Sequence, residues 1–156
     1  MKRRAILAFT LDNPGVLNKV SMLIRKKMYN VDTLTVCRSR IPGVSRMTIT
    51  LKEDDETRVT QIIKQLEKFT EVISAKELDT DHSYWREVAI VKLEVDAAHL
   101  QDLPGRYNFE VLEQKGEDVH ILQVVGSTRR IDAFLDEVGQ EHIIEIARTG
   151  VTALEK

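Results

Sequence analysis

The sequence of 156 residues contains one cysteine, Cys37, so it cannot form a disulfide within the chain and it fits a reducing compartment. It has no apolar run close to the ~20 residues that a membrane-spanning helix needs. A charged N-terminus precedes a short apolar stretch, but this stretch stops at Leu11 and no small-residue cleavage site follows, which argues against a signal peptide. We therefore expect a soluble, cytoplasmic protein with no membrane partner.

An excess of basic charge is also missing. The chain has 23 Lys and Arg against 25 Asp and Glu, spread along its length, and its net charge is −2. A general nucleic-acid binder needs a basic face, and aromatic residues, which could stack on bases, make up only 5% of this chain. We therefore expect no nucleic-acid partner. The densest basic runs, residues 2–4 and 25–27, are expected to be solvated surface.

The motifs of common catalytic and metal sites are absent as well. The seven glycines form neither the Rossmann nor the P-loop spacing, and the four histidines are too isolated to act together as zinc ligands. Cys37 has no base close to it in the sequence and is expected to be structural. The acidic run 53–56 is typical of a solvated helix start, and Gly126-Ser127-Thr128 is typical of a helix cap. The sequence thus predicts no catalytic residue and no metal ligand.

The first half of the chain has the hydrophobic pattern of strand, helix, strand, strand, helix and strand. The strands are expected over 5–11, 31–39, 45–52 and 71–78, and the helices from near Pro14 and after the acidic run. Asp12 or Asn13 can cap the first helix. Strict alternation over 45–52 predicts one buried and one polar face. Two helices on one face of a four-stranded antiparallel sheet is the ferredoxin-like arrangement.

A polar linker then leads into a second unit of the same kind. We expect a strand over 86–95, a short helix over 97–103, a hairpin of 109–113 and 119–125, a helix over 129–138 capped by Ser127 or Thr128, and a last strand over 143–148. The fold class is therefore α+β, with two ferredoxin-like βαββαβ units. The expected domains are residues 1–79 and 86–156, joined by the linker 80–85.

The turn from the first strand into the first helix, Asp12-Asn13-Pro14-Gly15-Val16-Leu17, has the properties of a small-anion site. Proline and glycine allow a tight turn and a close approach of the backbone to a ligand. The first amides of a helix have no internal partners and can bind a carboxylate, while Asp12 or Asn13 can accept from an amino group. On physical grounds alone, a plain capped turn is the favoured interpretation.

This turn, together with residues 29–36 and 45–49, resembles the ACT domain of one family, the small regulatory subunit of acetolactate synthase. In the second half, Lys92 and the segments 126–127, 131–135 and 144–150 are similar to the same family. The resemblance covers nearly the whole chain. The sequence departs from the family at Asp12, where Asn is frequent, at Met28, where glycine is common, and in a shortened stretch over 101–118.

The resemblance implies a chain with no catalytic activity and no cofactor of its own, which regulates branched-chain amino acid biosynthesis. Its partner would be the catalytic large subunit, which carries thiamine diphosphate, Mg²⁺ and FAD and condenses pyruvate with a second 2-ketoacid. The small subunit would raise that activity and confer feedback inhibition, usually by valine.

The resemblance also implies an effector site. Its residues would be Asp12, Asn13, Pro14, Gly15, Val16 and Leu17 of one chain, with Asn30 and Val31 of a second chain across a homodimer interface between ACT domains. In a ferredoxin-like sheet the second strand lies at an edge, so pairing of two such edges would hide their unpaired backbone groups. Val31, Leu34 and Val36 belong either to this interface or to the core.

Two other functions remain open on the sequence alone. A free-standing ACT-type sensor would keep the turn but act on a different client protein. A small enzyme with a ferredoxin-like fold would need a polar constellation that the sequence does not show.

Overall fold

A computed structural model describes all 156 residues, and its contacts divide the chain into two compact units. The first unit consists of Met1–Tyr84 together with Ala153–Lys156, and the second of Trp85–Thr152. The domain limits expected from the sequence, 1–79 and 86–156, stay predictions. Ser83 and Tyr84, inside the expected linker, form the start of a strand. No helix of the structure combines the length and apolar character needed to cross a membrane.

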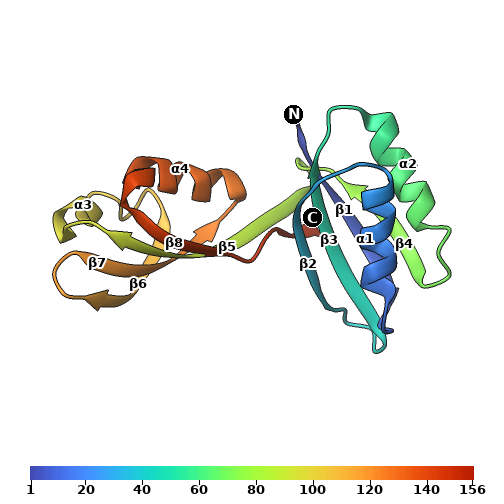
Figure 1. Ribbon diagram of the computed structural model, residues 1–156, viewed down its shortest axis with the longest axis horizontal. Coiled ribbons are helices and arrows are strands. Elements are labelled where there is room, and N and C mark those ends of the chain that lie inside the picture. The colour runs from blue at the N-terminus through green and yellow to red at the C-terminus, as the bar shows by residue number, and fades with distance from the viewer. The chain divides into compact units, whose positions relative to one another are not determined.

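The first unit has the expected βαββαβ order. Its elements are β1 (Arg3–Leu11), α1 (Val16–Lys26), β2 (Val31–Arg38), β3 (Val44–Lys52), α2 (Glu56–Leu66) and β4 (Val72–Leu78). The sheet has the strand order β2-β3-β1-β4, and every pairing is antiparallel. Figure 1 shows α1 and α2 side by side on one face of this sheet. Strand β2 therefore lies at an edge, as the sequence predicts.

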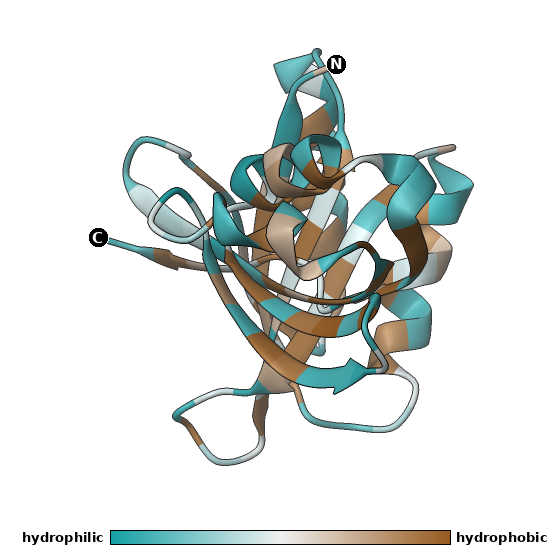
Figure 2. Cartoon of the chain, turned by 90° about the vertical axis from the view of Figure 1, so that its left-hand side faces the viewer, coloured by the Kyte–Doolittle hydropathy of each residue, from teal (hydrophilic) through white to brown (hydrophobic).

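The core of the first unit lies between the sheet and the two helices. Ile6 and Ile49 from the strands and Val20, Ile24 and Ile62 from the helices are between 0% and 3% exposed. These residues meet in one layer because residues three and four apart share one side of a helix, and alternate residues share one face of a strand. Figure 2 shows hydrophobic residues concentrated in the strands and running as stripes beside hydrophilic residues on the helices.

The prediction that residues 45–52 have one buried and one polar face is only partly correct. Thr48 and Thr50 are 1% and 0% exposed, because β3 is an inner strand flanked by β1 and β2. The hydroxyl groups of Thr50 and Thr33 lie 2.6 Å apart and share a hydrogen bond across the β2–β3 pair. A buried hydroxyl needs such a partner, so this face of the sheet is polar but largely dry.

The start of α1 differs from the expectation. The helix begins at Val16 rather than near Pro14, with Gly15 in the left-handed conformation (φ +85°) as its N-cap, and no side chain caps it. Asp12 does not cap the helix; its carboxylate accepts a hydrogen bond from Ser45 Oγ at 3.1 Å. Since Gly15 makes the turn, Asp12 and Asn13 lie too early in the chain to reach the helical amides as caps.

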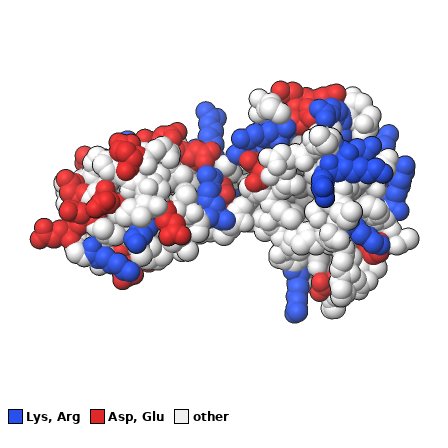
Figure 3. Space-filling view, viewed as in Figure 1, with Lys and Arg blue, Asp and Glu red and all other residues white.

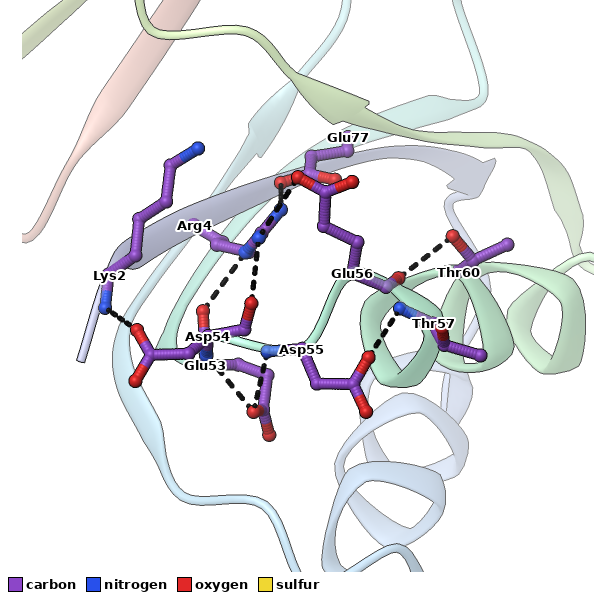
Figure 4. Close-up of polar contacts among 9 residues, drawn as sticks. All are labelled: Lys2, Arg4, Glu53, Asp54, Asp55, Glu56, Thr57, Thr60 and Glu77. Atoms are coloured by element: carbon purple, nitrogen blue, oxygen red, sulfur yellow. Dashed lines mark hydrogen bonds and ion pairs between the residues drawn. The ribbon is translucent and has the colours of Figure 1, made fainter.

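The expectation that the basic run 2–4 is solvated surface is wrong for Arg4. Its side chain is 4% exposed and joins three elements (Figure 4). Nε donates to the carbonyl of Glu53 at 2.9 Å, and Nη2 to that of Asp54 at 3.2 Å. Nη1 donates to Glu77 of β4 at 2.8 Å, and Glu56 at the start of α2 lies 3.4 Å from Nη2. The hydrogen bond to Glu77 raises the pKa of Arg4, so the guanidinium remains charged.

The acidic run 53–56 is likewise more than a solvated face. Glu53 is 7% exposed, and its Oε1 accepts from the amides of Asp54 and Asp55 at 3.0 and 3.1 Å. Asp55 caps α2, since its carboxylate accepts from the amide of Thr57 at 2.8 Å. The run thus closes the backbone at the helix start and presents the carbonyls that Arg4 binds.

Met28, which follows α1, has a left-handed backbone with φ +61°. It is the only non-glycine residue with a positive φ, and a side chain in this conformation costs about 1–2 kcal/mol. The left-handed position after a helix is the one that glycine commonly occupies. Glycine would therefore relieve strain that methionine brings to this position.

Met28→Gly is expected to raise the free energy of unfolding of the first unit by about 1 kcal/mol. Little packing is lost, because the Met28 side chain is 88% exposed. Hydrogen exchange of the α1 and β1 amides would measure the gain. Met28→Ala, which keeps the Cβ atom and the strain, should leave stability nearly unchanged; a gain as large as that of glycine would contradict the strain explanation.

The second unit is built on the sheet β6-β7-β5-β8, and a further strand, β9, pairs with β5. Its elements are β5 (Ser83–Glu94), α3 (Ala97–Gln101), β6 (Asn108–Lys115), β7 (Val119–Gly126), α4 (Thr128–Val138), a 3₁₀ turn (Gln140–His142) and β8 (Ile143–Arg148). Strand β9 (Thr152–Glu155) starts at the last residue of this unit, and its other residues belong to the first unit. The hairpin and the Ser127 cap are confirmed, since Ser127 accepts from the amide of Arg130. The expectation that 143–148 is the last strand was wrong, because β9 follows it.

The segment Arg148-Thr149-Gly150 has a structural role in the second unit. Arg148 binds both carboxylate oxygens of Glu87, at 3.0 and 2.7 Å, and also Asp132 at 2.7 Å. The Glu87 side chain is 1% exposed, so its pair with Arg148 ties β8 to β5 through a buried carboxylate, whereas Asp132 of α4 is 46% exposed. The amide of Thr149 donates to the carbonyl of Val88 at 3.0 Å and extends the pairing.

Candidate functional site

The turn between β1 and α1 is held from two sides by backbone hydrogen bonds. The amide of Leu11 donates to the carbonyl of Glu71 at 2.8 Å, and the amide of Asp12 donates to the carbonyl of Gly43 at 2.9 Å. These bonds fasten the turn to the loop before β4 and to the β2–β3 hairpin. The turn is therefore fixed to its neighbours at this end of the sheet.

The backbone of this turn is open to a ligand. Residues 12–15 are exposed, and a Cβ atom at Gly15 would meet nothing within 4 Å. The amide of Lys19 donates to the carbonyl of Gly15 at 3.1 Å, so the amides at 17 and 18 precede the first helical bond. With no side-chain cap, they can bind a carboxylate, and the positive end of the helix dipole favours that charge. The turn thus offers donors for a small carboxylic acid.

The side chains around these amides differ in exposure. Val16 is 4% exposed and packs in the core, whereas Leu17 is 43% exposed. Asp12 retains acceptor capacity beyond its bond to Ser45, because a carboxylate can accept several hydrogen bonds. The turn therefore combines free amides, a carboxylate and an apolar surface within six residues, which matches the three parts of an apolar amino acid.

Asn30 and Val31 lie at the other end of the sheet in the same chain. Leu11, next to the turn, pairs with Val44 at the start of β3, whereas Val31 pairs with Leu51 near its end. Val44 and Leu51 are seven positions apart in β3, a span of about 23 Å along the strand. A single chain therefore does not bring the two predicted parts of the effector site together.

Asn30 lines a separate hollow of about 370 Å³ in the first unit, which the sequence analysis did not predict. Next to it, the Arg58 guanidinium lies over the Tyr29 ring, 4.6 Å from its centroid. Asp32 in the same hollow pairs with Arg3 at 2.6 Å. Lys52 also lies 3.9 Å from Asp32, and Arg58 lies 3.1 Å from Glu53, so the charges of this hollow are already matched and none is left unpaired for a ligand.

Comparison with known proteins decides what kind of chain this is. Residues 6–74 match the family described as the "AHAS small subunit-like ACT domain", and residues 86–156 match "Small subunit of acetolactate synthase". The probable acetolactate synthase small subunit of Methanothermobacter thermautotrophicus is 32% identical over 155 residues, which cover 97% of this chain and 91% of that protein. The chain belongs to the acetolactate synthase small-subunit family.

Two further acetolactate synthase small subunits support this assignment. The isozyme 3 small subunit of Escherichia coli is 32% identical over 159 residues, covering 98% of this chain and 96% of that protein. The crystal structure of the acetolactate synthase small subunit from Thermotoga maritima matches with a TM-score of 0.88 at 29% identity, over 100% of this chain and 98% of that one. The chain is thus a regulatory small subunit, and the first unit contains its ACT domain.

All eight predicted effector residues lie inside the segment that matches the ACT family. Their assignment as effector ligands stays a prediction. Arg4, which the sequence analysis did not single out, lies before that segment and stabilises the sheet on which the turn is built. The available signal was its position directly before the apolar run 5–9 of β1, together with four acids at 53–56.

Proposed function

We propose that this small subunit activates the catalytic large subunit of acetolactate synthase and makes it sensitive to feedback inhibition by valine or another branched-chain amino acid. The observation that carries the proposal is the exposed turn at Gly15, with uncapped helical amides and open space beside it. The thiamine diphosphate, Mg²⁺ and FAD of the reaction would all be held by the large subunit.

The separation of the two half-sites supports a homodimer in which each pocket is shared. Arg38 of β2 pairs with Ser45, which in turn pairs with Thr10 of β1, so this end of β2 lies at the same end of the sheet as the turn. If two β2 strands pair antiparallel about their midpoint, Val31 of the second chain falls opposite Arg38. Asn30 of the second chain then lies next to the turn, and the dimer forms two equivalent pockets.

The exposure of the β2 side chains fits this interface. Leu34 and Val36 are 37% and 42% exposed, so they are not core residues of one chain. They pair with Ile49 and Met47, whose side chains face the helices, and so they lie on the helix side of the edge. Val31 is half-buried against the core and contributes to both the core and the pocket wall. Covering this edge would also satisfy its free backbone groups.

Each group of the effector has a matching partner in the proposed pocket. The carboxylate would lie on the amides that follow Gly15, the ammonium would lie against Asp12, and the branched side chain would contact Leu17 and Val31 of the second chain. Inhibition requires that the effector binds one arrangement of the dimer more tightly than another, since equal affinity shifts no equilibrium.

An activity assay tests the proposal directly. Adding the small subunit to the purified large subunit of the same organism should raise the rate of acetolactate formation severalfold. Valine should then inhibit the complex but not the large subunit alone. No change in rate together with no added inhibition would defeat the proposal and favour a stand-alone ACT sensor with a different client.

A further inference from the structure

A groove on the helix side of the first unit lies away from the effector turn. It has a volume of about 700 Å³ and runs between α1 and the end of α2. Leu23 and Phe69 are half-buried in it, whereas Met22 and Met28 are 59% and 88% exposed. Apolar side chains that gather around one hollow on a surface mark an interaction site more often than scattered ones do.

The rim of this groove is basic. Arg25 and Lys26 line it with exposed side chains, and Lys19, which is also exposed, pairs with Glu71. Figure 3 shows Lys and Arg side chains gathered over α1 in the first unit. This unit carries sixteen Lys and Arg against twelve Asp and Glu, a net charge of +4 within a chain whose total is −2. An acidic partner would therefore be attracted to this side of the ACT domain.

The groove remains free when two copies pair through β2. Lys19 and Leu23 lie one turn apart on the side of α1 that faces α2, whereas Leu17 lies on the opposite side, because two residues turn a helix by about 200°. The β2 edge is on the far side of β3 from β1 and β4. Pairing of the β2 edges extends the sheet and keeps the helices of both copies on one face. A second copy is thus the occupant of the edge and not of the groove.

Met28 adds an independent argument. Its side chain lines the groove from a strained left-handed backbone and is exposed, so within the chain it brings strain without packing. Strain of this kind persists where a residue serves a contact outside the fold. Methionine side chains are flexible and polarizable, and they suit a surface that adapts to a helix.

We infer that this groove docks an acidic amphipathic helix of the catalytic large subunit. Apolar side chains of that helix would enter between Met22 and Met28, and its carboxylates would meet Arg25 and Lys26. The inference rests on the proposed function, since it requires that the large subunit is the partner. It assigns the contact to the helix face of the ACT domain, so the effector pocket at the β2 edge and the docking groove use different surfaces of one unit.

Binding of the full-length small subunit to the purified large subunit tests the inference. The double variant Arg25→Glu and Lys26→Glu should raise the dissociation constant at least ~10-fold. It should also reduce the salt dependence of binding, because rim charges steer and hold an acidic partner. Lys64→Glu reverses the same charge in the last turn of α2, outside the groove, and should change the constant less than ~2-fold. Equal effects of the two sets would overturn the inference.

Met28→Gly separates docking from folding. It should weaken large-subunit binding about 5-fold while hydrogen exchange shows a more stable first unit, so a folding defect cannot explain the loss. Valine binding and the homodimer, measured on the small subunit alone, should be unchanged. Loss of the homodimer in these variants would make the groove an interface between copies and overturn the inference. If the unmodified chain does not bind the large subunit, the proposed function fails as well; normal binding by all variants overturns the groove alone.

Discussion

Gly15→Asp should abolish valine inhibition of the reconstituted acetolactate synthase while leaving its activation by the small subunit intact. Gly15 is exposed and a side chain there would enter the open space beside the helical amides. A carboxylate in that space would occupy the amides and repel the carboxylate of valine. The loss of one charge-assisted hydrogen bond and the added repulsion should cost about 3 kcal/mol of the binding free energy of valine. Half-inhibition should then require about 100-fold more valine.

Two controls separate charge from backbone strain. Gly15→Asn has nearly the shape of aspartate without its charge, and it should retain part of the inhibition. Gly116→Asp places the same residue at a left-handed glycine (φ +70°) in the β6–β7 hairpin, where a Cβ atom also meets nothing within 4 Å. This variant should keep normal inhibition. The rate of acetolactate formation is measured at varied valine for complexes with each of the three variants. Normal inhibition of the Gly15→Asp complex would show that the pocket is elsewhere.

Arg4→Met should lower the free energy of unfolding of the first unit by about 3 kcal/mol. The substitution keeps an apolar stem but leaves the carbonyls of Glu53 and Asp54 and the carboxylate of Glu77 without the donor that joins them. Glu77 and Glu56 are partly exposed and can be hydrated, so the buried carbonyls carry most of the loss. Hydrogen exchange of the β1 and β4 amides would report it.

The neighbouring Arg3 supplies the matched control. It pairs with Asp32 at 2.6 Å, but its side chain is 28% exposed, and partly exposed ion pairs contribute little. Arg3→Met should therefore cost less than about 1 kcal/mol. Arg4→Lys keeps the charge without the planar fork and should fall between the two. If Arg3→Met and Arg4→Met destabilise equally, the network around Arg4 is not the reason for its burial.

The parts of the fold that depend on local pattern were predictable. The strand over β3, the helix α2 and the hairpin of β6 and β7 follow from residues close together in the chain, and the structure confirms them within a few residues. The Ser127 cap is similarly local, since donor and acceptor are three residues apart.

The parts that failed depend on distant residues. Arg4 is buried because carbonyls about 50 residues later point at it, which no window around Arg4 reveals. The left-handed Met28 contradicts the residue preference of its own position. For the candidate site, the expected cap by Asp12 or Asn13 was wrong, because Gly15 takes the N-cap position and Ser45 of another strand donates to Asp12. The span of about 23 Å along β3 that separates the turn from Val31 follows only from the register of the strands.

The return of the C-terminus to the first unit has a consequence for how the protein is made. Residues 153–156 pack with the first 84: Arg46 donates to the carbonyl of Ala153, and the amide of Lys156 donates to the carbonyl of His82. The ACT unit is therefore still incomplete when the ribosome has finished the second unit, although N-terminal domains generally fold first during synthesis. The sensor therefore closes only after residues 153–156, which are synthesised after the whole second unit, have emerged from the ribosome.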